Sequence, residues 1–193
     1  MRLVVAMTGA TGAVIGIRTL QALDALGVET HLVVSKWARA TIRIETSYDI
    51  DDVLGLASKV YSERDQAAAI SSGSFRTDGM IVVPCSMKTL AAIRTGYTDG
   101  LVARAADVVL KERRRLVLVA RESPLNAIHL ENMLALTHAG ATVLPPMPAF
   151  YNHPETTADI VDHVVARILD QFGLDNDLTS RWNGARNREK EKS

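Results

Sequence analysis

The segment that most constrains the fold of this chain is MTGATGA, residues 7–13. An apolar run, residues 3–6, precedes it, and a run typical of a helix, residues 14–26, follows it. A strand, a glycine-rich turn and a helix in this order open many phosphate-binding α/β domains. Glycine permits a positive φ angle and lets a phosphate group approach the backbone closely. The segment therefore predicts a phosphorylated ligand beside the amide groups that begin the helix.

Apolar strands alternate with helix-like segments along the rest of the chain. We expect strands at residues 3–7, 29–34, 59–61, 80–83, 116–120 and 141–144. Helices are expected at residues 12–26, 37–45, 49–57, 86–94, 99–113, 124–138 and 156–172, with a short helical piece at 67–70. Pro84 is expected to stop one strand and Pro124 to start one helix. This pattern is typical of a three-layer α/β fold with a doubly wound, mostly parallel sheet.

The very apolar strand at residues 116–120 is expected at the centre of the sheet, because it has no polar face. No internal repeat and no linker divides the chain. We therefore expect a single domain over residues 1–185, followed by a charged, disordered tail at residues 186–193.

The composition narrows the class of protein further. The 193 residues include 22 Lys and Arg and 22 Asp and Glu, a balance that argues against nonspecific nucleic-acid binding. The single cysteine, Cys85, excludes an internal disulfide and a multi-cysteine zinc site, and fits a small buried residue better than a nucleophile. No apolar run reaches the ~18–20 residues of a membrane span. We expect a cytoplasmic protein without a membrane partner and without a metal.

In a doubly wound sheet, ligands bind at the carboxyl ends of the strands. The loops expected there are residues 8–11, 35–36, 84–88, 121–124 and 145–151. They are rich in hydroxyl and cationic side chains, which suit a phosphorylated ligand.

A dinucleotide is the first ligand to consider, and the glycine pattern does not support it. The dinucleotide fingerprint places glycines as G-x-G-x-x-G, and a G-x-x-G-x-x-G variant fails because Ile15 precedes Gly16. Ser35 and Lys36 stand where an acid would bind the ribose. These residues favour a mononucleotide, with a dinucleotide as the alternative.

Several strand-end residues have two possible roles. Ser86 is placed to cap a helix, and it could also bind a ligand. Arg121 and Glu122 could hold phosphate and move a proton, or form a solvated ion pair. Arg104 and Lys111, seven residues apart on one helix, could likewise be simple surface charges.

Several motifs occur together in one order. They are MTGATGA at 7–13, SK at 35–36, ISSGSF at 70–75, PCSMKT at 84–89, RAADVVLKER at 104–113, RESPL at 121–125, PPMPAFY at 145–151 and LDQF at 169–172. In this combination the chain resembles the UbiX-type flavin prenyltransferases over residues 3–182. Within that family, SKWA at 35–38 and FYNHPET at 150–156 are most similar to the branch that is named after the phenolic or hydroxyaryl acid decarboxylases.

The resemblance implies a flavodoxin-like Rossmann fold that binds FMN, in a homododecamer with active sites between subunits. It implies transfer of a dimethylallyl group to N5 and C6 of reduced FMN without a metal. The donor is dimethylallyl phosphate, or the diphosphate in some members. The product, prenylated FMN, is the cofactor of a partner UbiD-type aromatic acid decarboxylase.

The resemblance also implies site residues. Those for FMN are Gly9, Ala10, Thr11, Ser35, Ser86, Met87, Lys88, Thr89 and Arg121. Those for the prenyl phosphate are Arg104, Lys111, Arg121, Tyr151 and Arg167, with Trp182 enclosing the prenyl group. The catalytic residues would be Glu122, Thr11, Glu45, Lys111 and Arg121. Many members have serine where this chain has Thr11, which keeps the hydroxyl and adds a methyl group.

Three alternatives to a flavin prenyltransferase are considered. One is a non-catalytic FMN carrier subunit, which needs the flavin loops but not the cations. A second is an NADP-dependent oxidoreductase, suggested by the glycine loop with Lys36 and Arg39. The third, a flavoprotein that decarboxylates peptidyl or pantothenoyl cysteine, fits poorly because residues 145–151 lack the Asn-containing motif of that class.

Overall fold

The apolar residues that open the chain form strand β1 (Arg2–Met7) in a computed structural model, which describes residues 1–184. The chain divides into two units, Met1–Pro146 and Met147–Ser193. The tail expected at residues 186–193 lies outside the described residues.

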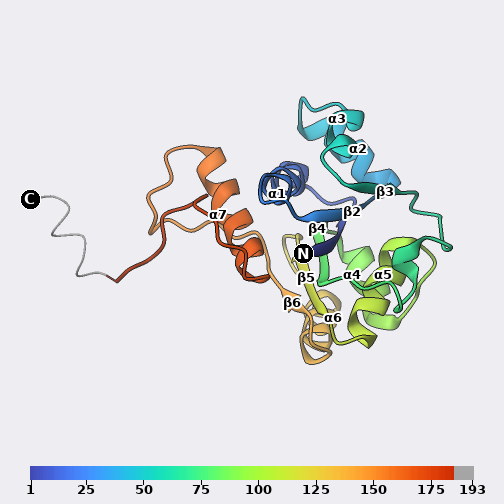
Figure 1. Ribbon diagram of the computed structural model, residues 1–193. Helices are drawn as coiled ribbons and strands as arrows, with labels where there is room; N and C mark the ends of the chain where they lie inside the picture. Colours follow the sequence, from blue (N-terminus) through green and yellow to red (C-terminus); the bar gives the residue numbers. More distant parts are fainter. Residues whose placement is uncertain (185–193) are drawn as a thin grey trace, which may run out of the picture. The chain divides into compact units, whose positions relative to one another are not determined.

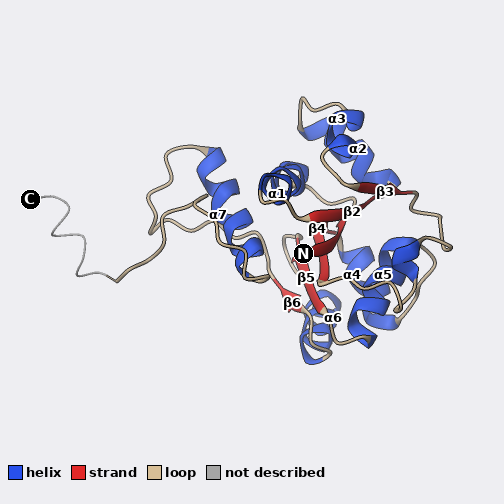
Figure 2. Ribbon diagram, in the orientation of Figure 1, coloured by secondary structure: helices blue, strands red, loops and turns tan. Residues whose placement is uncertain are grey.

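The first unit contains one parallel sheet (Figures 1 and 2). Within residues 1–146, six strands lie in the order β3-β2-β1-β4-β5-β6. After β1, their bounds are β2 (Glu29–Val34), β3 (Lys59–Tyr61), β4 (Gly79–Cys85), β5 (Arg115–Ala120) and β6 (Thr142–Val143). The chain winds outward from β1 to β3, and then outward in the other direction from β4 to β6. The expected doubly wound α/β fold of flavodoxin-like type is therefore confirmed, and the sheet is parallel throughout.

Helices cover both faces of this sheet (Figure 1). Helix α1 packs against α2 on one face, and α4 packs against α5 and α6 on the other. The bounds are α1 (Ala13–Ala25), α2 (Lys36–Glu45), α3 (Ile50–Gly55), α4 (Met87–Thr95), α5 (Leu101–Lys111), α6 (Ala127–His138) and the 3₁₀ turn η1 (Ala69–Ser71). Strand β4 is buried along its whole length, as expected for a strand covered on both faces.

Three expectations about this unit are wrong in detail. Strand β4 continues through Pro84 to Cys85, because the pairing with β5 is irregular between Val82 and Cys85 and a proline without an N–H group fits there. Helix α6 begins at Ala127 rather than at Pro124, because Asn126 caps it with His129 in a capping box. Strand β5 lies second from the edge, while β1 and β4 are central.

The second unit is built around helix α7 (Thr157–Asp170). Thr156 and Asp159 form a capping box at its start, and its buried face includes Val165 and Ile168. The side chains of Asn152 and Thr179, one on each side of the helix in sequence, are joined by a hydrogen bond of 3.1 Å. Across residues 1–184, helices long and apolar enough to span a membrane are absent.

Candidate functional site

Three glycines in and just after the turn between β1 and α1 are required by the backbone geometry or by close packing. Gly12 has a φ angle of 102° at the start of α1, a conformation that other residues rarely adopt. A Cβ atom on Gly9 would overlap the Cβ of Trp37, so α2 packs directly on this turn. A Cβ atom on Gly16 would lie 2.6 Å from the carbonyl oxygen of Val83, so α1 approaches β4 at this point. The spacing G-x-x-G-x-x-x-G thus gives a tight turn and close packing, two of the features of phosphate-binding glycine loops.

Thr8 joins the loop after β1 to the loop after β4. Its hydroxyl group donates a hydrogen bond to the carbonyl of Pro84 (2.8 Å) and accepts one from the amide of Ser86 (2.8 Å). Thr8 is only 2% exposed. The winding direction of the chain changes between β1 and β4, and ligands bind at this point in doubly wound sheets. Thr8 therefore fixes the two loops relative to each other at the edge of the sheet where a ligand would bind.

Two serines with a predicted ligand role cap the helices that follow their strands. The hydroxyl oxygen of Ser35 accepts a hydrogen bond from the amide of Ala38, at 3.1 Å, at the start of α2. The hydroxyl oxygen of Ser86 accepts one from the amide of Thr89, at 3.3 Å, at the start of α4. The capping role weighed for Ser86 is thus present. It is compatible with ligand binding, because these helix starts lie at the carboxyl ends of the strands.

The start of α1 has an acidic side chain as its cap. A carboxylate oxygen of Glu45 accepts hydrogen bonds from the amides of Gly12 (2.9 Å) and Ala13 (3.0 Å). Similarly, the carboxylate of Glu63 accepts a hydrogen bond from the amide of Lys36, at 2.9 Å, at the start of α2. Two helix starts at this edge therefore already interact with carboxylates of the chain itself. This arrangement places Glu45, a predicted catalytic residue, directly beside the glycine turn.

A cavity of about 350 Å³ opens between the starts of α2, α4 and α5. Lys36, Lys88 and Arg64 contribute positive charge to its lining, and Trp37 and Tyr97 contribute aromatic rings. Thr89, a predicted flavin residue, also lines it. Met87 differs from its neighbours because its side chain is buried in the core. Glu63 and Asp99 also line it, so the cavity combines aromatic rings with charges of both signs, and its size suits a small-molecule ligand.

Arg121 and Glu122 follow β5 at the same edge, and both are exposed. The amide of Arg121 donates a hydrogen bond to the carbonyl of Cys85, at 3.1 Å, which ties this loop to the end of β4. The carboxylate of Glu122 accepts a hydrogen bond from the amide of Ser123 at 3.1 Å. The structure therefore brings Glu122 and Arg121 to the edge that carries the glycine turn, Ser35 and Ser86.

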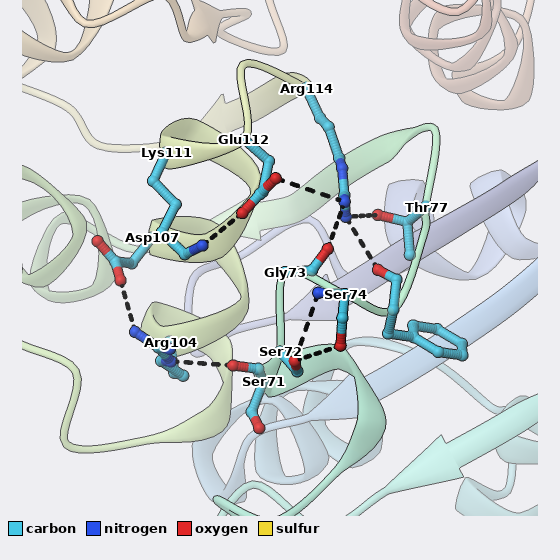
Figure 3. A network of polar contacts seen from close by, with 11 residues as sticks. Ser71, Ser72, Gly73, Ser74, Thr77, Arg104, Asp107, Lys111, Glu112 and Arg114 are labelled. Atoms are coloured by element: carbon cyan, nitrogen blue, oxygen red, sulfur yellow. Dashed lines mark hydrogen bonds and ion pairs between the residues drawn. The ribbon is translucent and has the colours of Figure 1, made fainter.

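Arg104 and Lys111 lie at opposite ends of helix α5, Arg104 in its first turn and Lys111 at its last residue. Helix α5 runs opposite to the strands, so that Lys111, four residues before β5, lies at the amino-terminal edge of the sheet. There its ammonium group pairs with Glu112 (Figure 3). Arg104 donates a hydrogen bond to the carbonyl of Ser71 (3.1 Å) and pairs with Asp107 (2.8 Å). In a single copy of the chain, Lys111 and the loops at the carboxyl ends of the strands therefore lie at opposite edges of the sheet.

The second unit holds the other predicted substrate residues. The ring of Tyr151 packs edge-on against the rings of Trp182 and His163, with centroid distances of 5.7 and 5.6 Å. Arg167, one helical turn after His163, pairs with Asp170 at 2.6 Å. Burial lowers the pKa of His163, and the charge of Arg167 lowers it further. The sequence motifs did not single out His163, although its spacing of four residues from Arg167 would have placed the two side chains on one helix face.

No three His, Cys, Asp or Glu side chains among residues 1–184 gather in a group that could hold a metal ion. The charges that the described chain offers at its strand ends are cations and single carboxylates. The groups available to a ligand at the carboxyl edge of the sheet are therefore mainly hydroxyl groups, backbone amides and cationic side chains.

The fold and this set of residues define a flavoprotein, and comparison with known proteins identifies the family. The Flavoprotein family model matches residues 1–169. A probable UbiX-like flavin prenyltransferase from Escherichia coli O157:H7 is 67% identical over 185 residues, which are 95% of this chain and 94% of that protein. The chain belongs to the flavoprotein family and, within it, to the UbiX-like flavin prenyltransferases.

Two solved structures have the same fold. One is a dodecameric FMN-dependent UbiX-like decarboxylase from Escherichia coli O157:H7, with a TM-score of 0.94 and 67% identity over 95% of this chain and all of that one. The other is AnUbiX (PadA1) in complex with FMN and dimethylallyl pyrophosphate, with a TM-score of 0.94 and 62% identity over 95% of this chain and 97% of that one.

Proposed function

We propose that the chain is a metal-independent flavin prenyltransferase, which joins a dimethylallyl group to N5 and C6 of reduced FMN. The observation that carries this proposal is the similarity, at 62% identity and a TM-score of 0.94, to a protein solved with FMN and dimethylallyl pyrophosphate. Reduced FMN supplies the nucleophilic positions of the reaction. The protein has to bind both partners, align them and stabilise the departing phosphate.

The residues at the carboxyl edge of the sheet fit a flavin phosphate. Hydroxyl groups, backbone amides at helix starts and cations are the usual partners of such a group. The nearby cavity of about 350 Å³ has cationic and aromatic lining residues, which suit the remainder of a flavin. The proposed FMN residues are Gly9, Ala10, Thr11, Ser35, Ser86, Met87, Lys88, Thr89 and Arg121, with Met87 acting through its backbone.

Cations and a hydroxyl group would stabilise the departing phosphate. Negative charge accumulates on its oxygens as the bond to the allylic carbon breaks, and donors aimed at those oxygens lower the barrier. Glu122, next to Arg121 in sequence, would move a proton at the phosphate. Thr11 and Glu45, which caps the glycine turn, would act beside the flavin. The donor is dimethylallyl phosphate, with the diphosphate as the alternative. The proposed residues are Arg104, Lys111, Arg121, Arg167 and the hydroxyl of Tyr151, with Trp182 enclosing the prenyl group.

We also propose that several copies of the chain build each active site. Lys111 lies at the edge of the sheet opposite the glycine turn, so a neighbouring copy has to supply it. The dodecameric relative from Escherichia coli supports a homododecamer. The product would serve a UbiD-type decarboxylase, and the proposed location is the cytoplasm. Residues 1–185 would act together as one FMN-binding domain.

Anaerobic incubation with reduced FMN and either donor tests the proposal. Mass spectrometry of the released flavin should show the added mass of one dimethylallyl group. Arg121→Ala and Glu122→Gln should reduce product formation, whereas Glu131→Gln, an exposed control on α6, should not. Bound FMN that remains unmodified with both donors would instead support a flavin carrier subunit. Tight binding of NADP without FMN would support an oxidoreductase.

A further inference from the structure

The chain reverses direction sharply after helix α5. Arg113 has a φ angle of 56°, and the amide of Arg114 donates a hydrogen bond to the carbonyl of Val109 at 2.9 Å. This geometry ends the helix immediately after Lys111 and Glu112. As a result, Lys111, Glu112 and Arg114 all face the loop at residues 71–77 (Figure 3).

The side chain of Arg114 binds the backbone of this loop. Its guanidinium group donates hydrogen bonds to the carbonyl oxygens of Gly73 (2.7 Å) and Phe75 (3.0 Å). The side chain of Arg114 is only 16% exposed, and the planar fork of donors suits two fixed acceptors. The loop is therefore fixed relative to the end of α5.

Glu112 connects Arg114 to Lys111. One carboxylate oxygen of Glu112 pairs with the ammonium group of Lys111, and the other lies 3.9 Å from the guanidinium group of Arg114. The hydrogen bond from Lys111 lowers the pKa of Glu112, as expected for a carboxylate that pairs with an ammonium group. The ammonium group of Lys111 is thus held by Glu112, which in turn interacts with Arg114.

Gly73 leaves room for this pair. A Cβ atom on Gly73 would lie 2.7 Å from the Nζ atom of Lys111, and closer still to a carboxylate oxygen of Glu112. Both atoms are the ends of flexible side chains. An added methyl group would therefore displace the ion pair rather than the backbone.

We propose that Gly73, Glu112 and Arg114 are positioning residues, which set the ammonium group of Lys111 for the phosphate of the prenyl donor. This inference rests on the proposed function, in which Lys111 binds that phosphate. The three residues act through Lys111 and need not touch the donor. Arg114 holds the loop, Glu112 orients the ammonium group, and the missing side chain of Gly73 provides its place.

The full-length protein loaded with oxidised FMN allows donor binding to be measured without turnover. Calorimetry with dimethylallyl phosphate should show roughly tenfold weaker binding for Gly73→Ala, the scale of losing one charged hydrogen bond. Affinity for FMN should not change. Gly55→Ala is the matched control, because a Cβ atom on Gly55 would meet nothing within 4 Å. Arg114→Lys, which keeps the charge but loses the fork, should also weaken donor binding.

A double-mutant cycle separates positioning from a general structural effect. If Gly73 acts through Lys111, then Gly73→Ala should cause little further loss of donor affinity in a Lys111→Ala background. Equal losses in both backgrounds, or unchanged binding in Gly73→Ala, would overturn the proposal. Product formation with reduced FMN is measured separately. Absence of product together with the expected binding pattern would contradict the proposed function and leave the positioning role supported.

Discussion

The carboxylate of Glu45, at the end of helix α2, accepts a hydrogen bond of 2.9 Å from the amide of Gly12, at the start of helix α1. The same oxygen accepts a second hydrogen bond, of 3.0 Å, from Ala13. Gly12 has no side chain with which to cap the helix itself. A residue with a predicted catalytic role thus also supports the local structure of the glycine turn.

Replacing Glu45 with alanine should therefore destabilise the protein in addition to any effect on catalysis. Loss of a helix cap should lower the free energy of unfolding by about 1 kcal/mol. Urea unfolding of the protein without flavin measures this effect. Glu131→Ala, at an exposed position of α6, should change it by less than about 0.5 kcal/mol. Equal stability of Glu45→Ala and the unmodified protein would contradict the capping role.

Replacing Thr8 with valine should weaken both the fold and FMN binding. Valine has the shape of threonine but leaves the partly buried amide of Ser86 without its hydrogen bond. The expected loss in the free energy of unfolding is about 1–3 kcal/mol. Thr8→Ser keeps the hydroxyl group and should retain most of the affinity for FMN, measured by flavin fluorescence. The prediction fails if valine and serine behave alike.

Glu29 should make stability depend on acidic pH. Hydrogen bonds from Arg2 and then from His31 lower its pKa from 4.5 to about 2 in the folded protein. Because the folded state favours the charged carboxylate, its contribution is fully present above pH ~4.5 and is lost as the pH falls toward 2. Urea unfolding should show a difference between the unmodified protein and Glu29→Gln that shrinks over this range. A constant difference would be inconsistent with this ion pair.

Cys85 should be unreactive in the folded protein. Burial raises the pKa of its thiol to about 12, so the reactive thiolate is scarce at pH 8. A disulfide reagent that reports free thiols should react slowly under native conditions and rapidly in guanidinium chloride. Prompt reaction of the native protein would show that this part of β4 opens readily.

The alternation of apolar strands and helices was enough to predict the doubly wound sheet. The errors arose where a neighbour outweighed a local signal. Pro124 is a common helix start, yet Asn126 with His129 offers a better cap and begins α6 three residues later. Pro84 is expected to end a strand, yet its carbonyl oxygen accepts hydrogen bonds from Thr8 and strand β4 continues to Cys85. The contact between Thr8 and Pro84 joins residues 76 positions apart, which local patterns do not contain, whereas the Asn126–His129 cap is local and was outweighed by the proline signal.

The site was predictable to a similar degree. The hydroxyl groups and cations after the strands could be placed at one edge, because parallel strands end together. The hydrogen bond by which Glu45 caps helix α1 could not be predicted, since it joins residues 33 positions apart. The position of Lys111 follows from the direction of α5, which places it at the opposite edge of the sheet. If Lys111 binds the donor as proposed, a second copy of the chain has to supply it.

The glycines of the first turn affect how mutational data on this family should be interpreted. Gly9 and Gly16 are required by the close packing of Trp37 and Val83, independently of any ligand. A larger residue at either position would move a helix, and weaker flavin binding would follow as a secondary effect. Loss of binding in such a variant would therefore report a displaced helix rather than a lost contact with the flavin. Thr11, exposed in the same turn, is the better position for probing a direct contact.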